Sequence, residues 1–320
     1  MRISVKRLAF MLCFSLAVIQ PAGAENISIA TGGTGGVYYP IGGGIASVLS
    51  KKVPGMEATA EVTGGSVDNL KLIDGDVSYI GMTMADAGQD AYRGENKFKG
   101  RKVPLRTLMI MYPNRMHVVT VEGRGINTIA DLKGKRISTG SPGSATEVMA
   151  FRILEAAGLD KDKDVKRERL SVAESVNGVK DNKIDAFFWV GGLPTAAVTD
   201  LANTPGTKLK MIDNAELVPA MNKKYGNLYV QDTIPKATYR GMDADNHQAT
   251  VMNLLVANEK MDDKTAYNII KTIFESRDDL IAVHKDTADF KLENQKAEAS
   301  PIPFHPGAIK YFEEHGVKFN

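Results

Sequence analysis

One local pattern occurs twice in this chain: a β-strand, a glycine-rich loop and an amphipathic helix. The first copy runs from a strand expected at residues 26–30 into the loop 31–36, after which apolar residues recur at helical spacing. The second copy begins at residues 135–138, and Thr-Gly-x-x-Gly at 31–35 returns at 139–143, 108 positions later. Strand, loop and helix in this order open a β-α-β unit. The fold class that we predict is therefore α/β.

A second pair of segments supports the repeat. Ser66-Val67 is echoed by Ser175-Val176, 109 positions on. Two copies in the same order, at nearly constant spacing, indicate two lobes built on one plan. Chance similarity between two β-α-β units is the alternative.

The lobes are expected to be joined by two crossings of the chain. Separate strands are expected at 107–112, 116–121 and 249–257. The last two would carry the chain from one lobe to the other and back, if the C-terminal segment packs on the first lobe. Paired crossings of this kind make a hinge. The predicted boundaries are 25–116 with 250–320 for lobe 1, and 117–249 for lobe 2.

The first 24 residues have the pattern of a secretory signal peptide. Three basic residues precede an uncharged apolar stretch, 8–19, and Ala22-Gly23-Ala24 supplies the small residues that signal peptidase needs. The apolar stretch is shorter than the ~20 residues that span a bilayer, which argues against a membrane anchor. We expect cleavage after Ala24 and a secreted, periplasmic protein.

Cysteine content and charge exclude several classes of protein. The single cysteine, Cys13, lies inside the predicted signal peptide, so the secreted chain would have no disulfide and no thiolate. Removing 24 of 320 residues leaves 296, enough for two domains. The formal charge of +2 includes three basic residues of that segment and leaves −1. This balance gives no support for nucleic-acid binding or for attachment to anionic membranes.

Glycines are concentrated at the first loop. Four occur in residues 31–39, and Gly42-Gly43-Gly44 follow in the first turns of the predicted helix, where each costs about 1 kcal/mol relative to alanine. Close packing of the helix on the sheet is one explanation. We favour the other, in which backbone N–H groups approach a ligand, because a helix N-terminus suits a carboxylate. Nucleotide loops are excluded, since Val37-Tyr38-Tyr39 stands where the Walker and Rossmann motifs need other residues.

Three further loops are expected at the carboxyl ends of strands, where open α/β sheets bind their ligands. They are Gly64-Gly65-Ser66, the segment 141–146 and the segment 188–192. Ser144 and Glu147 form a capping box, so plain helix capping is the alternative for those hydroxyls.

No catalytic or metal motif is found. The five histidines are scattered without a His-Glu-x-x-His spacing, and no Gly-x-Ser-x-Gly elbow occurs. The sequence therefore nominates no catalytic residue, no metal site and no cofactor, and we predict a binding protein. A periplasmic enzyme that reuses this fold is the alternative.

Four stretches, 31–50, 61–86, 140–159 and 185–202, resemble the TAXI family, the substrate-binding subunits of TRAP (tripartite ATP-independent periplasmic) transporters. The likeness extends over nearly all of the chain after the signal peptide. It implies a type II periplasmic-binding-protein fold, with two α/β lobes, a two-stranded hinge and a cleft between them. It also implies capture of a small organic anion, such as a dicarboxylate, glutamate or 2-oxoglutarate, and delivery to integral-membrane TRAP subunits. We expect a monomer.

Together with the loops above, the resemblance predicts ligand contacts in both lobes. The expected ligand-binding residues are Thr34, Gly35, Gly36, Tyr39, Ser66, Thr83, Ser144, Ala145, Thr146, Trp189 and Gly191. One position departs from the family pattern: Met84 stands where many relatives have a glutamine, so their substrate preference need not extend to this chain. No arginine can be assigned to the anion, although Arg115 and Arg240 lie near predicted inter-lobe segments. A receptor for an ABC transporter or a sensor kinase, with the same fold, remains the alternative.

Overall fold

The computed structural model describes residues 25–319, so the predicted signal peptide and its cleavage site lie outside the described residues. The strands are β1 (Glu25–Ala30), β2 (Met56–Glu61), β3 (Tyr79–Met84), β4 (Leu105–Val121), β5 (Arg136–Ser138), β6 (Lys166–Glu168), β7 (Ala186–Gly191), β8 (Leu209–Met211), β9 (Val230–Ile234) and β10 (Asn246–Asn258). The α-helices are α1 (Tyr38–Lys52), α2 (Ser66–Gly75), α3 (Ala85–Arg93), α4 (Ala145–Ala156), α5 (Val172–Lys180), α6 (Ala196–Asn203), α7 (Val218–Tyr225), α8 (Asp263–Glu275), α9 (Arg277–Val283) and α10 (Pro306–Glu314). Within 25–319, no helix has the length and apolar character needed to cross a membrane.

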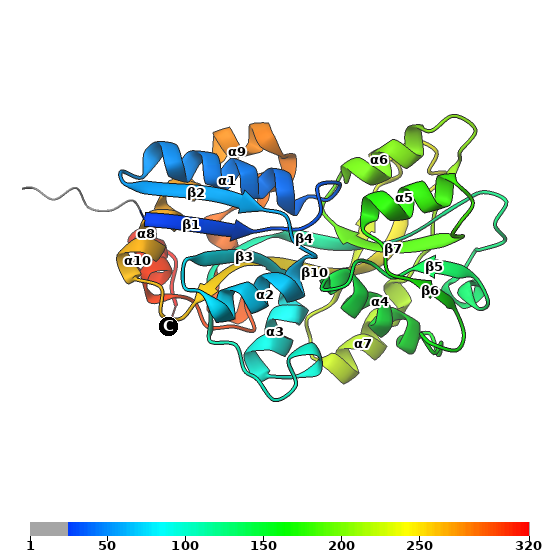
Figure 1. The fold of residues 1–320 in the computed structure, drawn as a ribbon, viewed down its shortest axis with the longest axis horizontal. Helices are drawn as coiled ribbons and strands as arrows, with labels where there is room; N and C mark the ends of the chain where they lie inside the picture. Colours follow the sequence, from blue (N-terminus) through cyan, green and yellow to red (C-terminus); the bar gives the residue numbers. More distant parts are fainter. Residues whose placement is uncertain (1–24, 320) are drawn as a thin grey trace, which may run out of the picture.

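The strands repeat one arrangement in two halves of a mixed sheet. Its order is β2-β1-β3-β10-β4-β7-β5-β6, with β8 beside β4 and β9 beside β10. In the first half β1 lies between β2 and β3, parallel to both, and β3 pairs with the antiparallel β10. In the second half β5 lies between β6 and β7, again parallel to both, and β7 pairs with the antiparallel β4. Helices cover both halves, which gives two α/β lobes and confirms the prediction of one plan used twice (Figure 1).

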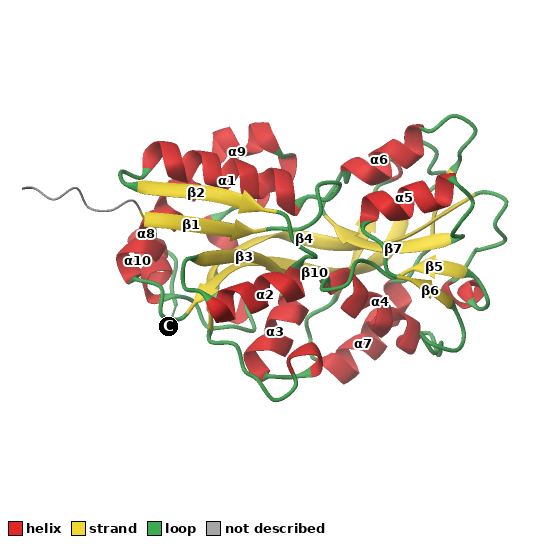
Figure 2. Ribbon diagram, in the orientation of Figure 1, coloured by secondary structure: helices red, strands yellow, loops and turns green. Residues whose placement is uncertain are grey.

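Two long strands connect the lobes. β4 and β10 pair with each other in antiparallel fashion and extend from one lobe into the other (Figure 2). The separate strands expected at 107–112 and 116–121 are one continuous strand, although Pro113 lies between them. Proline is accommodated at bulges, and β4 places two residues, Met111 and Tyr112, opposite the single Asn253 of β10. The side-chain amide of Asn253 donates to the Tyr112 carbonyl at 3.2 Å.

The C-terminal helices return to the first lobe, as expected. There α8 and α9 pack against α1, and α10 packs against α8. A Cβ on Gly42 would lie 2.4 Å from Thr31 Cγ2, and one on Gly44 would lie 3.2 Å from the side chain of Leu280 in α9. Close packing therefore explains these two helical glycines, in contrast to the ligand-based explanation that we favoured.

Helix α3 was not expected from the sequence. Its segment, ADAGQDAYR, is rich in small and polar residues, yet Asp86 and Asp90 are buried. The Arg152 guanidinium of α4 reaches both carboxylates, at 3.4 Å from Asp86 and 2.6 Å from Asp90. The Tyr229 hydroxyl also donates to Asp86, at 2.7 Å. Burial of this helix thus depends on partners that are distant in the sequence.

Candidate ligand-binding site

A cavity lies between the two lobes, at the carboxyl ends of β1, β3 and β7. The empty space inside it, which includes solvent at its mouth, is about 590 Å³. Its walls come from the first lobe, the second lobe and the connecting strand β4. The cavity therefore changes shape if the lobes move relative to each other.

Four helices begin at this cavity. Val37, Gly65, Ser144 and Ser171 are the residues that precede α1, α2, α4 and α5, and all four line it. The first N–H groups of a helix lack partners within the helix, and the aligned peptide dipoles make that end positive. Two such ends from each lobe converge on one space, which suits an anion.

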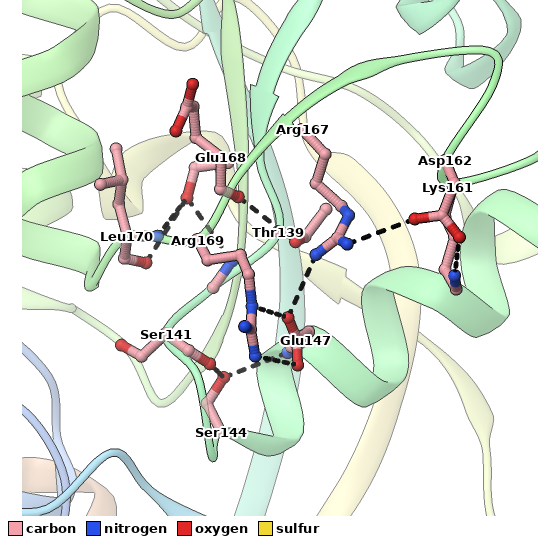
Figure 3. A network of polar contacts seen from close by, with 12 residues as sticks. Thr139, Ser141, Ser144, Glu147, Lys161, Asp162, Arg167, Glu168, Arg169 and Leu170 are labelled. Carbon is pink, nitrogen blue, oxygen red and sulfur yellow. Dashed lines mark hydrogen bonds and ion pairs between the residues drawn. The ribbon is translucent and has the colours of Figure 1, made fainter.

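The start of α4 is fixed by a polar network (Figure 3). Ser144 Oγ accepts from the Glu147 N–H at 3.2 Å and donates to the Ser141 carbonyl at 2.7 Å. The Glu147 side chain does not close the expected capping box but is buried against two arginines, with Arg169 Nε 2.6 Å from Oε1 and Arg167 Nη1 3.3 Å from it. Helix capping thus occupies the Ser144 hydroxyl, while the α4 backbone remains at the cavity wall.

The start of α5 was missed at the sequence level. Ser171 Oγ accepts from the Glu174 N–H at 3.3 Å, and Glu174 accepts from the Ser171 N–H at 2.8 Å. This capping box, Ser-x-x-Glu before an apolar run, can be recognised in the sequence as the start of a helix. Its position beside the cavity depends on the fold and cannot be recognised there.

Trp189 forms part of the second-lobe wall. Its indole N–H donates to Thr195 Oγ1 at 2.8 Å, which fixes the ring. A Cβ on Gly36 would lie 2.8 Å from Trp189 Cη2. The glycine at position 36 therefore lets the first-lobe loop touch the indole ring of the second lobe.

Tyr112 and Asn114, both on β4, line the cavity and were not expected. They are 0% and 2% exposed, and the Tyr112 hydroxyl and Asn114 Oδ1 have no hydrogen-bond partner among the described residues. Burial raises the pKa of the Tyr112 hydroxyl well above its ordinary value, so the group is a neutral donor. Buried polar groups almost always have partners. The interruption of an apolar strand by Tyr-Pro-Asn was the available sequence signal.

Seven of the eleven predicted ligand-binding residues line the cavity. They are Gly36, Ser66, Ser144, Ala145, Thr146, Trp189 and Gly191. Thr146 Oγ1 also accepts from the Val190 N–H at 3.4 Å, which connects α4 to β7.

The other four, Thr34, Gly35, Tyr39 and Thr83, do not line it. Thr34 is exposed at the loop tip. Because α1 begins at Tyr38 and successive helical residues point about 100° apart, Tyr38 reaches the cavity while Tyr39 is 37% exposed. Thr83 lies on the opposite face of β3 from Met84, since strand residues alternate, and Met84 lines the cavity instead.

Gly35 is a point of contact between the two lobes. A Cβ there would lie 3.2 Å from the Ala173 Cβ and 3.4 Å from the Ala197 Cβ. Its carbonyl accepts from the Ala197 N–H at 3.3 Å, and the Asp68 N–H of the first lobe donates to the Gly143 carbonyl of the second at 3.1 Å. The lobes are therefore in direct contact on two sides of the cavity.

No charged side chain lines the cavity. Of the two arginines considered above, Arg115 is paired with Asp232, with 2.8 Å between Nε and Oδ2, and Arg240 is exposed. In the described part of the chain, no group of three His, Cys, Asp or Glu side chains could hold a metal ion. Any charge on a ligand would be met by backbone donors and hydroxyls.

Solved structures share this fold. The periplasmic binding protein BugD is 14% identical with a TM-score of 0.57, and the alignment covers 94% of this chain and all of BugD (100%). MatC from Rhodopseudomonas palustris, with bound malate, is 10% identical with a TM-score of 0.56, over 90% of this chain and 96% of MatC. These likenesses confirm the predicted two-lobed periplasmic-binding-protein fold. A model of the NMT1-like family matches residues 29–316. The chain therefore belongs to the NMT1-like family.

Proposed function

We propose that this protein is the extracytoplasmic solute-binding receptor of a TRAP transporter. It captures a small organic anion between its lobes and delivers it to the integral-membrane subunits. The observation that carries this proposal is the convergence of four helix N-termini, two from each lobe, on one cavity. An anion held from both sides binds the closed form better than the open form, and this difference drives closure.

The transporter class rests on the resemblance to the TAXI family. That resemblance gives the ligand as a dicarboxylate, glutamate or 2-oxoglutarate, and the malate bound to MatC is also a small organic anion. The protein acts in the periplasm as a monomer after cleavage behind Ala24, and it is not an enzyme. Its lobes are 25–116 with 250–320 and 117–249, so the hinge lies within β4 and β10.

A ligand screen tests the receptor function. The secreted chain, residues 25–320, is unfolded thermally with dicarboxylates, monocarboxylates, amino acids and keto acids. A ligand at a hundred times its dissociation constant adds about 2.7 kcal/mol of stability and raises the unfolding temperature. A ligand recovered unchanged after incubation supports a receptor. Chemical turnover of that ligand would establish an enzyme, and no stabilisation by any organic anion would refute the proposal.

An uptake assay separates the transporter classes. Membrane vesicles that contain the partner subunits are supplied with the purified receptor and the labelled ligand. Uptake that follows an ion gradient and needs no ATP supports a TRAP transporter. Uptake that requires ATP hydrolysis would identify an ABC transporter instead. The absence of both forms of uptake would favour a sensor kinase partner.

A further inference from the structure

The internal repeat gives the lobes two equivalent contacts. By strand order, β1, β2 and β3 correspond to β5, β6 and β7, so α1, α2 and α3 correspond to α4, α5 and α6. The contact of α3 with α4, the α3–α4 junction, therefore has its counterpart in the contact of α6 with the loop before α1, the α1–α6 junction. We infer that the lobes pivot at the α3–α4 junction and part at the α1–α6 junction.

The two junctions lie on opposite faces of the sheet. A Cβ on Gly42 of α1 would lie 3.5 Å from Met82 Cε, whereas a Cβ on Gly88 of α3 would lie 3.4 Å from Thr83 Cγ2. Met82 and Thr83 are neighbours on β3, and neighbouring strand residues point to opposite faces. A rotation about one junction therefore separates the lobes most on the face of the other.

Opposite charges are buried at the α3–α4 junction. Arg152 of α4 reaches Asp86 and Asp90 of α3, and all three side chains are at most 5% exposed. The Tyr229 hydroxyl accepts from Arg152 Nη1 at 2.7 Å and donates to Asp86 Oδ2 at 2.7 Å. Tyr229 directly precedes β9, which pairs with the connecting strand β10. The junction is therefore bonded to both lobes and to the hinge.

Small side chains and single hydrogen bonds make up the α1–α6 junction. A Cβ on Gly35 would lie 3.4 Å from Ala197 Cβ, and the Gly35 carbonyl accepts from the Ala197 N–H at 3.3 Å. Beside them, the Leu193 N–H of the second lobe donates to the Asp286 carboxylate of the first at 2.8 Å. Water replaces such bonds when the lobes part, so the net contribution of each is modest.

The difference between the junctions sets the direction of opening. A small separation at the α3–α4 junction would leave buried charges without their partners, which is strongly unfavourable. Separation at the α1–α6 junction breaks no pair of opposite charges. A surface groove on that side is lined by residues of both lobes, and Gly36 and Val37 line both this groove and the cavity. Opening there gives a solute a direct path to the cavity.

Distances between pairs of spin labels test the direction of opening. Residues 25–320 contain no cysteine, so two introduced cysteines carry the labels. Ser47→Cys in α1 with Asn203→Cys in α6 spans the α1–α6 junction. Arg93→Cys in α3 with Lys223→Cys in α7, which packs on α4, spans the α3–α4 junction. All four positions are exposed.

In the ligand-free protein, the distance across the α1–α6 junction should exceed its value in the structure, whereas the distance across the α3–α4 junction should equal it. Similar lengthening of both distances, lengthening of the second alone, or lengthening of neither would overturn the inference. The measurement needs no ligand. A ligand screen without hits would therefore refute the proposed function and leave these distances as an independent result.

Arg152→Lys tests the pivot itself. Lysine keeps the charge, but its ammonium group cannot reproduce the planar set of bonds that the guanidinium makes, so the distance across the α3–α4 junction should lengthen. Arg136→Lys is the matched control, because Arg136 Nη2 pairs with Asp185 at 2.7 Å within the second lobe, and neither distance should change. Tyr229→Phe removes only the shared hydroxyl and should lengthen the α3–α4 distance less. Distances that stay unchanged in both Arg152→Lys and Tyr229→Phe would show that this junction is not the pivot.

Discussion

At the scale of single residues, Gly36 is where the first lobe approaches the Trp189 ring. Gly36→Ala adds a Cβ 2.8 Å from Trp189 Cη2, whereas Gly33→Ala adds one with nothing within 4 Å. We expect the first change to lower the free energy of unfolding by about 1–3 kcal/mol and the second by less than about 0.5 kcal/mol. Urea unfolding of both variants measures the difference. Equal effects would mean that the loop moves away from the ring at no cost.

Helix capping and ligand binding can be separated at Ser144. Ser144→Ala should cost about 1 kcal/mol of stability through loss of the cap and should also weaken anion binding, because the α4 N-terminus frays at the cavity. Asp262→Ala removes a similar cap, the 3.0 Å bond to the Thr265 N–H of α8, away from the cavity. Calorimetry should show weaker binding in the first variant only. Unchanged affinity in Ser144→Ala, and in Thr146→Ala, would remove both residues from the site.

Residue types and spacing predicted one set of wall residues and missed another. Ser66 and Thr146 could be predicted from the sequence, because loops at the carboxyl ends of strands line the clefts of such folds. Tyr112 and Asn114 could not be predicted from the sequence, because their position depends on a bulge opposite Asn253. The register across a sheet depends on residues that are distant in the chain. The choice of Tyr39 rather than Tyr38 was a matter of one residue in the helix start, where boundaries are least certain.

At the scale of elements, α3 of the first lobe and α4 of the second are joined by the buried Arg152 cluster. Burial raises the pKa of Asp90 from an ordinary value of 3.8 to about 6, and Arg152 offsets this only in part. The folded protein therefore holds this proton more tightly than the unfolded chain does. Ionisation of Asp90 lowers stability as the pH rises through the window from 3.8 to about 6, and protonation restores it as the pH falls.

Asp90→Asn removes this titration. Between about pH 4.5 and pH 6.5, the wild type should lose on the order of 2 kcal/mol relative to the variant, since one pKa unit corresponds to about 1.4 kcal/mol. Urea unfolding of both proteins at the two pH values measures it, and the difference between them cancels the other titrating groups. A difference independent of pH would contradict the raised pKa.

Sequence periodicity predicted α1 and α4 but not α3. The first two carry apolar residues at helical spacing, whereas α3 buries carboxylates, which no local pattern predicts without knowledge of Arg152. Strand β4 was divided in two for a related reason. Proline and asparagine ordinarily mark a turn, and only the pairing with β10 shows that the strand continues.

At the scale of the whole molecule, the repeat of 108 residues corresponds to the repeated strand order of the two lobes. The lobes contact each other through Asp68 and Gly35, as expected for a closed arrangement. Small-angle scattering should give a larger radius of gyration for the ligand-free protein than for the complex, because an anion held from both sides favours closure. The Ser144→Ala, Thr146→Ala double variant should not contract at the same ligand concentration. Identical curves with and without bound ligand would contradict capture by closure.

Trp189 is the only tryptophan of the chain, and its ring lies between the lobes beside Gly36. The protein therefore contains a single indole fluorophore, and it lies at the surface where we propose that capture takes place. Opening of the lobes would hydrate the indole and shift its emission to longer wavelength, and closure would reverse the shift. Stopped-flow fluorescence on the unlabelled protein can then resolve whether the lobes close before or after the ligand arrives.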